Sequence, residues 1–425
     1  EVSPCVMPSD KQQFSPGSKN WIQKYFQLVE NKVFSIDSIS DQYQKEDTFY
    51  SLASKTGLIY GIPTRFIYFD AIATDSYTSD EKLKLLFFEF LLYLYQQNKQ
   101  GPIDKSLFFK SLHAFYNEKN DVKWINKLFK TSELENIENT LSSRILIETS
   151  IFESNYWFNY LSNCFLFVDL ILYQEFLKNK LVSIQFNYSS YVSFVLKGII
   201  YMAYADNKID KKEKRLLTHF LSSTQIQKDA KQKIELLIDE GVNLSAFNVE
   251  KIENRSLSKL IFELGRFISV ASHELSITEK KIHLEFAFFL GLTDDEIQES
   301  KLLCDLFLLE HNDKIAPLFS DKNSSLALTR VTNRWTRILG RNKEKLIIEL
   351  KESKELVALI QKSRSKELTK QEKEMVKNQF MDILKSVPSI GIFLLPGGAL
   401  LLPLILKIVP DLLPSSFKEN QVDQE

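Results

Sequence analysis

Three carboxylates lie close together in the middle of the chain and could bind a divalent cation. Asp206, Asp210 and Glu213 surround a short acidic turn, and carboxylate oxygens are ligands that hard cations such as Ca²⁺ prefer. The segment lacks the glycine and the alternating acidic residues of an EF-hand loop. The alternative is that Asp210 and Glu213 stabilise the beginning of a helix, where negative charge is favourable. The residues leave both interpretations open.

The sequence carries no recognisable catalytic motif. It has no GxSxG, Walker A, GxGxxG or HExxH pattern, and its twelve glycines leave little material for a phosphate-binding loop. The five histidines are scattered. Glu279 and His283 share one face of a helix, but a single i,i+4 pair supplies too few ligands for a zinc site. We therefore predict that the protein is not an enzyme and needs no cofactor.

Helices must position these residues, because the sequence predicts an all-α fold. Between Pro102 and Pro317 there is no proline, and only four glycines interrupt the interval. Apolar residues recur at intervals of three and four, as expected for amphipathic or buried helices. We expect four parts: a multi-helix N-terminal region (7–180), a helical domain (186–310), a basic helical connector (324–366) and a C-terminal segment (367–420).

The C-terminal segment contains an uncharged run with the length of a membrane-spanning helix. Residues 387–406 are 20 consecutive residues without a charge, and about 20 residues cross a hydrocarbon core of about 30 Å. Prolines break the run, which a membrane tolerates where neighbouring protein satisfies the freed carbonyls. A single span, a re-entrant hairpin and a kinked helix in a soluble core remain the alternatives. The candidate membrane residues are Val387, Pro388, Pro396, Gly397, Gly398, Pro403, Lys407, Pro410 and Pro414.

Charge is distributed unevenly around this run. The formal net charge of −1 argues against a DNA-binding protein. Residues 330–385 carry 15 basic and 8 acidic side chains, whereas residues 411–425 carry 1 and 4. Such a basic flank predicts that the N-terminal bulk is cytoplasmic. Contact with anionic lipid is an alternative role for this stretch, and for any individual lysine a plain solvated helix surface is an equal one. Contact with a ribosome is a third possibility, which would have to be salt-sensitive. The candidate contact residues are Arg330, Arg334, Arg337, Arg341, Lys343 and Lys345.

The three cysteines, Cys5, Cys164 and Cys304, are widely spaced and form no CxxC pair. They predict no disulfide framework, which fits a reducing compartment. The segment Trp21–Val29 is too short and too charged for a secretory signal.

The C-terminal motifs resemble the LETM family of membrane proteins. They are LTKQEK at 368–373, DILKSVP at 382–388, LPLILKIVP at 402–410 and LPSSF at 413–417. The resemblance implies one membrane segment, followed in the mitochondrial members by a soluble domain that contacts the ribosome. The chain ends at Glu425, so we expect that following domain to be missing. The layout is more similar to a bacterial group of LETM-related biofilm-associated proteins, which implies a bacterial inner-membrane location.

A second resemblance lies in the middle of the chain. The segment AYADNKIDKKE at 203–213 is similar to the signature of TerB-like helical domains, so the 186–310 domain is expected to be TerB-like. ASHELSITE at 271–279 repeats the same frame 66 residues later, with Glu279 equivalent to Glu213. A third, fainter copy at 73–81 predicts that Ser79 or Thr78 caps a helix that begins near Asp80.

Two functional hypotheses follow from the residues and these resemblances. In the first, a helical adaptor is tethered to the membrane by its C-terminal segment and binds protein partners, with a role in the envelope or in biofilm formation implied by the resemblance alone. In the second, the LETM-like segment takes part in cation/proton homeostasis, with Lys407 lining a path in an oligomer. We favour the first, because one lysine at the end of a span offers few intramembrane ionisable groups. Ribosome contact through the basic stretch is a third hypothesis.

Overall fold

The computed structural model describes residues 14–36, 48–69, 77–99, 103–117, 133–145, 162–178, 184–247, 254–272, 275–310 and 343–386. Every regular element in these ranges is a helix, and they contain no strand, so the predicted all-α fold is confirmed. The chain divides into two compact units. The first comprises residues 1–269 with 275–292, and the second comprises residues 270–274 with 293–425. The boundary at Leu292 falls inside the span predicted as one domain, 186–310.

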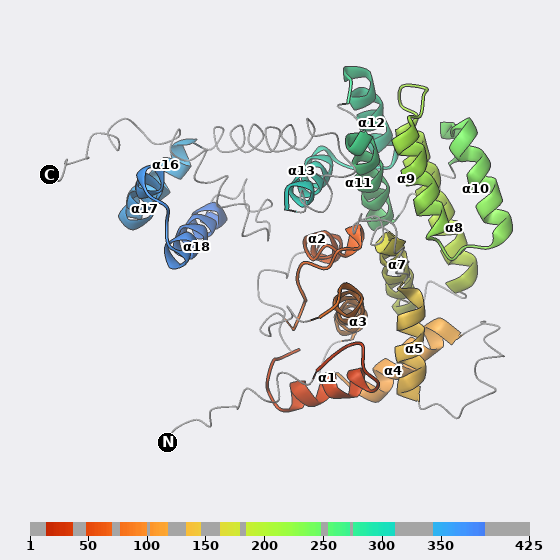
Figure 1. Cartoon of the computed structure of the whole chain (residues 1–425), viewed down its shortest axis with the longest axis horizontal. Helices are drawn as coiled ribbons and strands as arrows, with labels where there is room; N and C mark the ends of the chain where they lie inside the picture. The colour runs from red at the N-terminus through yellow and green to blue at the C-terminus, as the bar shows by residue number, and fades with distance from the viewer. Residues whose placement is uncertain are drawn as a thin grey trace. The chain divides into compact units, whose positions relative to one another are not determined.

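The first unit contains most of the helices, which are labelled in Figure 1. They are α1 (Trp21–Glu30), α2 (Thr48–Lys55), α3 (Ser79–Asn98), α4 (Lys105–Asn117), α5 (Glu133–Arg144), α7 (Leu166–Leu177), α8 (Ile184–Ala203), α9 (Lys211–Ser222), α10 (Lys228–Glu240), α11 (Arg255–Ser272, which ends beyond the boundary) and α12 (Ile277–Phe289), with the short 3-10 turns η3 (Leu58–Tyr60), η4 (Ser162–Phe165) and η5 (Leu244–Ala246).

Two of these helices, α3 and α7, form the centre of the unit. Both contain a stretch that is apolar on almost every side, and such a stretch is stable in a soluble domain only when neighbours surround it. α3 is buried almost continuously from Leu85 to Tyr95, α7 is buried from Leu166 to Tyr173, and the two pack against each other. Aromatic rings fill the space around α3; Trp21 of α1 meets Phe88 edge to face at 5.2 Å between ring centroids.

The helices α8, α9 and α10 pack together and are drawn in green in Figure 1. α8 also lies very close to α11. A Cβ at Gly198 of α8 would lie 2.3 Å from Cγ2 of Ile261, and one at Gly265 of α11 would lie 2.4 Å from Sδ of Met202. These glycines therefore allow a backbone approach that any side chain would prevent.

The second unit contains α13 (Asp294–Glu310), α16 (Lys343–Glu352), α17 (Lys354–Ser365) and α18 (Lys370–Ser386). The last three contact one another and are blue in Figure 1. Their shared interior includes Leu350, Leu356, Ile360, Val376 and Phe380. α18 ends at Ser386, directly before the uncharged run. Within the described ranges, no helix combines the length and the apolar composition needed to cross a membrane.

Candidate functional site

The acidic turn between α8 and α9 uses its carboxylates to begin a helix. Asp210 is the N-cap of α9, and its Oδ1 accepts hydrogen bonds from the backbone N–H groups of Lys212 and Glu213 at 2.7 and 2.8 Å. Oε2 of Glu213 accepts from the N–H of Asp210 at 3.1 Å, which completes a capping box. Asp206 accepts from the N–H of Lys208 at 2.9 Å.

These contacts match the helix-capping interpretation of the acidic turn. Asp206, Asp210 and Glu213 each direct an oxygen to a backbone N–H and do not converge on a common point. Across the described part of the chain, no group of three or more His, Cys, Asp or Glu side chains is arranged to hold a metal ion. The predicted metal site therefore gains no support from the geometry.

The same capping device recurs in the equivalent position 66 residues later. Ser276 is the N-cap of α12, where its N–H donates to Glu279 at 2.6 Å and its Oγ accepts from the N–H of Glu279 at 3.2 Å. The predicted equivalence of Glu213 and Glu279 is therefore confirmed for their local role. Both glutamates are buried at 2% and 5% exposure, so each also anchors its helix start against the core.

The faint third copy is also confirmed as a helix start. Thr78 is the N-cap of α3, and Thr78 and Glu81 form the capping box, with the N–H of Thr78 donating to Glu81 at 2.8 Å. The same device begins two helices of the second unit. The pairs are Thr293 with Glu296 before α13 and Thr369 with Glu372 before α18.

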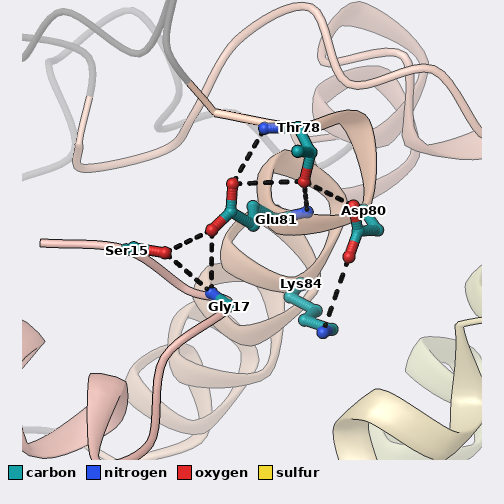
Figure 2. Close-up of polar contacts among 6 residues, drawn as sticks. All are labelled: Ser15, Gly17, Thr78, Asp80, Glu81 and Lys84. Carbon is teal, nitrogen blue, oxygen red and sulfur yellow. Dashed lines mark hydrogen bonds and ion pairs between the residues drawn. The ribbon is translucent and has the colours of Figure 1, made fainter.

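Glu81 has a second role, which Figure 2 shows. Its Oε1 accepts hydrogen bonds from the hydroxyl of Ser15 and from the N–H of Gly17, the latter at 3.1 Å. Burial alone would raise the pKa of Glu81, but the hydrogen bonds from Ser15, Thr78 and Gly17 together lower it below its ordinary value. One carboxylate thus holds the N-terminal segment against the start of α3.

Sequence reasoning missed a set of carboxylates in the core of the first unit. Glu89 of α3 is fully buried and accepts from the N–H groups of Ile67 and Tyr68 at 2.6 and 3.1 Å, and from the hydroxyl of Tyr25 at 3.0 Å. Burial raises the pKa of Glu89 to about 7, although these hydrogen bonds oppose the rise. This side chain therefore joins α1, the 66–69 segment and α3 around one titratable group.

Glu263 of α11 forms a second buried centre. It is fully buried and accepts from the hydroxyl of Tyr50 at 2.6 Å and from Ser54 at 3.1 Å, and also from the hydroxyl of Tyr60. Lys259, one turn earlier on α11 and 2% exposed, lies with its Nζ 5.7 Å from the centre of the Tyr50 ring. These contacts join α2 and η3 to α11 across more than 200 positions of sequence.

Asp169 of α7 forms the third centre, an ion pair with Arg144. The guanidinium of Arg144 donates from Nε to Oδ2 of Asp169 at 2.7 Å and from Nη2 to Oδ1 at 2.6 Å, which is a bidentate arrangement. Tyr116 donates to the same carboxylate at 3.3 Å, and Arg144 lies 4.6 Å above the ring of Tyr188. Burial opposes the charge of Arg144, but Asp169 outweighs it and raises the pKa of the guanidinium.

A signal for these centres was present in the sequence. Each acid stands alone inside an apolar run: LFFEFLL around Glu89, LFVDLIL around Asp169 and LIFELGR around Glu263. A charged side chain is almost never fully buried unless it is paired or hydrogen-bonded. A lone acid at the middle of an apolar helix therefore predicts a buried polar centre, although not its partners.

The residues predicted to contact the membrane and a ribosome lie mostly outside the described residues. This applies to Val387, Pro388, Pro396, Gly397, Gly398, Pro403, Lys407, Pro410 and Pro414, and to Arg330, Arg334, Arg337 and Arg341. Lys343 and Lys345 belong to the first turn of α16. The predictions for these positions stay predictions.

A comparison with known protein families gives a match in the C-terminal part of the chain. Residues 368–425 match the family model described as LETM1-like, RBD. The match begins at Leu368, one residue before the Thr369–Glu372 capping box, and covers the uncharged run, so the predicted LETM resemblance of this segment is confirmed. No curated protein and no solved structure matches the chain.

The position of this match bears on the expectation that the ribosome-contacting domain of the mitochondrial members is missing. The matched family model, whose description includes RBD, begins at Leu368 and continues to Glu425, so it covers both α18 and the uncharged run. The expectation that a further domain is missing stays a prediction.

Proposed function

We propose that the protein is a membrane-tethered helical adaptor of the LETM-related type. Its C-terminal segment attaches it to a membrane, and its large helical first unit binds other proteins. The observation that carries this proposal is the LETM1-like match over residues 368–425, which contains the 20-residue uncharged run. Such a run is long enough to cross a bilayer as a helix.

The local structure before the run supports this proposal. The capping box of Thr369 and Glu372 fixes where α18 begins, and α18 packs with α16 and α17 into a small helical module. The module leads directly into the run at Val387. A packed helical module therefore precedes the run directly in the sequence.

The proposal assigns no catalysis to the chain. The buried acids Glu89, Asp169 and Glu263 accept hydrogen bonds from residues of the core and are closed to solvent. In this proposal these groups hold helices together. The proposal also has finer parts. These are a bacterial inner-membrane location with a cytoplasmic first unit, a TerB-like character of residues 186–310, and a role in biofilm formation.

Membrane fractionation with carbonate extraction tests the tether. The full chain is compared with a truncation after Ser386, which keeps α18 whole. We expect the full chain to stay in the membrane fraction and the truncation to become extractable. If both are extractable, the run is part of a soluble core and the tether is refuted.

A matched pair of point variants separates insertion from other effects. Leu395→Arg places a charge near the middle of the run, which costs about 3 kcal/mol at the centre of a bilayer, and Leu395→Ile changes only the shape of the side chain. We expect extraction of the arginine variant alone. Equal membrane retention of both variants would show that the run does not span the bilayer.

Ribosome contact is a second candidate function, favoured by the description RBD of the matched model. The basic residues between Arg330 and Lys385 would bind ribosomal RNA through its phosphates, so binding would weaken steeply with salt. Co-sedimentation with ribosomes at low and high salt tests it. Absence of the protein from the ribosomal pellet at both salt concentrations would exclude this candidate.

A further inference from the structure

One face of α12 is exposed although it carries large apolar side chains. Ile277 and Phe288 are 86% and 47% exposed. They are eleven residues apart, which is close to three turns, so they lie on the same side of the helix. Leu284 is half-buried and lies between them on that side. The opposite side packs inward, where Nε2 of His283 lies 2.9 Å from the backbone oxygen of Met202 in α8.

Two opposite charges accompany this apolar side. Lys281 and Glu285 are 74% and 63% exposed, and they form an i,i+4 ion pair with 3.7 Å between Nζ and Oε1. Both project from the same flank of the helix, one turn apart. We call Ile277, Lys281, Leu284, Glu285 and Phe288 the α12 stripe.

We propose that the α12 stripe pairs with the α12 stripe of a second copy of the chain, with the two helices antiparallel. Ile277 and Phe288 are equally far from a point between Ile282 and His283. A two-fold axis at that point places each Ile277 opposite Phe288 of the other copy. Such a contact is isologous, because the same surface of each copy meets itself.

The charges select this arrangement among the alternatives. An axis near His283 also brings Lys281 opposite Glu285 of the other copy, and each Glu285 opposite the other Lys281. In a parallel, in-register pair each lysine would instead face a lysine, which is unfavourable. The α12 stripe is therefore complementary to itself in one orientation, which is why the occupant is a second copy and not an unrelated helix.

Analytical sedimentation of the full chain in a mild, density-matched detergent tests the proposal, because it gives the mass of the particle. We expect a dimer whose dissociation constant rises at least tenfold in Phe288→Glu. Leu236→Glu is the matched control, because Leu236 on α10 is also exposed, at 61%, but lies outside the α12 stripe. A wild-type chain that stays monomeric at all concentrations, or equal weakening by both variants, would overturn the proposal.

Charge-reversal variants test the orientation. Lys281→Glu alone places two acids opposite each other, and Glu285→Lys alone places two lysines opposite each other, so each variant should dimerise at least tenfold more weakly. Mixing the two variants should restore dimers, because each acid then faces a lysine. Circular dichroism of each variant checks that the helices are intact. Failure of the mixture to associate, with both variants folded, would refute antiparallel pairing.

Discussion

Glu89 gives the first unit a stability that depends on pH. Burial raises the pKa of this carboxyl from its ordinary value of 4.5 to about 7, whereas in the unfolded chain it titrates at its ordinary value. The folded protein therefore holds a proton that the unfolded protein has already lost. Because proton binding then favours the folded state, the free energy of unfolding should fall as the pH rises from about 4.5 to about 7.

The magnitude follows from the size of this shift. One pKa unit corresponds to about 1.4 kcal/mol, so a rise from 4.5 to about 7 is worth about 3 kcal/mol over the full window. Tyr25 and Tyr68 do not titrate in this range, because burial raises the pKa of each hydroxyl further above its ordinary value. The effect is therefore assigned to Glu89 alone among these three side chains.

The assay compares the wild type with Glu89→Gln by urea denaturation in mild detergent at pH 5, 6, 7 and 8. The glutamine oxygen can still accept from the N–H groups of Ile67 and Tyr68, so the variant should fold. We expect the wild type to lose about 2 to 3 kcal/mol of unfolding free energy relative to the variant between pH 5 and pH 8. Glu235→Gln, on the exposed side of α10, is the control and should follow the wild type.

Parallel pH dependence of the wild type and Glu89→Gln would refute this reasoning. A difference of opposite sign would be equally informative. It would show that the donors from Tyr25, Ile67 and Tyr68 stabilise the ionised carboxylate by more than burial destabilises it.

Two further predictions concern the other carboxylates. Replacing Asp210 by alanine removes the N-cap of α9 and should lower the free energy of unfolding by about 1 kcal/mol, whereas Asp210→Asn keeps an acceptor and most of the stability. Isothermal titration with Ca²⁺ should give no heat above dilution for the wild type or either variant. Calcium binding that depends on Asp210 would instead support the metal site. Asp169→Ala leaves the partly buried Arg144 without the fully buried carboxylate that pairs with it and should cost about 3 kcal/mol in a denaturation experiment. The control Asp239→Ala breaks the exposed pair with Lys214 and should change little, so equal losses would contradict the role of burial.

The features that the sequence determined by itself are local. The all-α class follows from the spacing of apolar residues and from the scarcity of proline and glycine. The helix starts at Thr78, Asp210 and Ser276 follow from hydrogen bonds that join residues three positions apart, so four consecutive residues contain the whole interaction. The LETM resemblance of residues 368–425 is likewise a property of one continuous segment.

Only the tertiary structure decided which groups meet in the core. Tyr50 and Glu263 are 213 positions apart, and the local sequence around either residue does not predict that the other is its partner. A lone acid in an apolar run indicates that some partner must exist, because an isolated buried charge is too costly. Which tyrosine, serine or arginine becomes that partner depends on how α2, α5, α7 and α11 pack. For Asp206, Asp210 and Glu213 the spacing permits a metal site or a helix cap, and the hydrogen bonds of their oxygens to neighbouring backbone N–H groups match the cap.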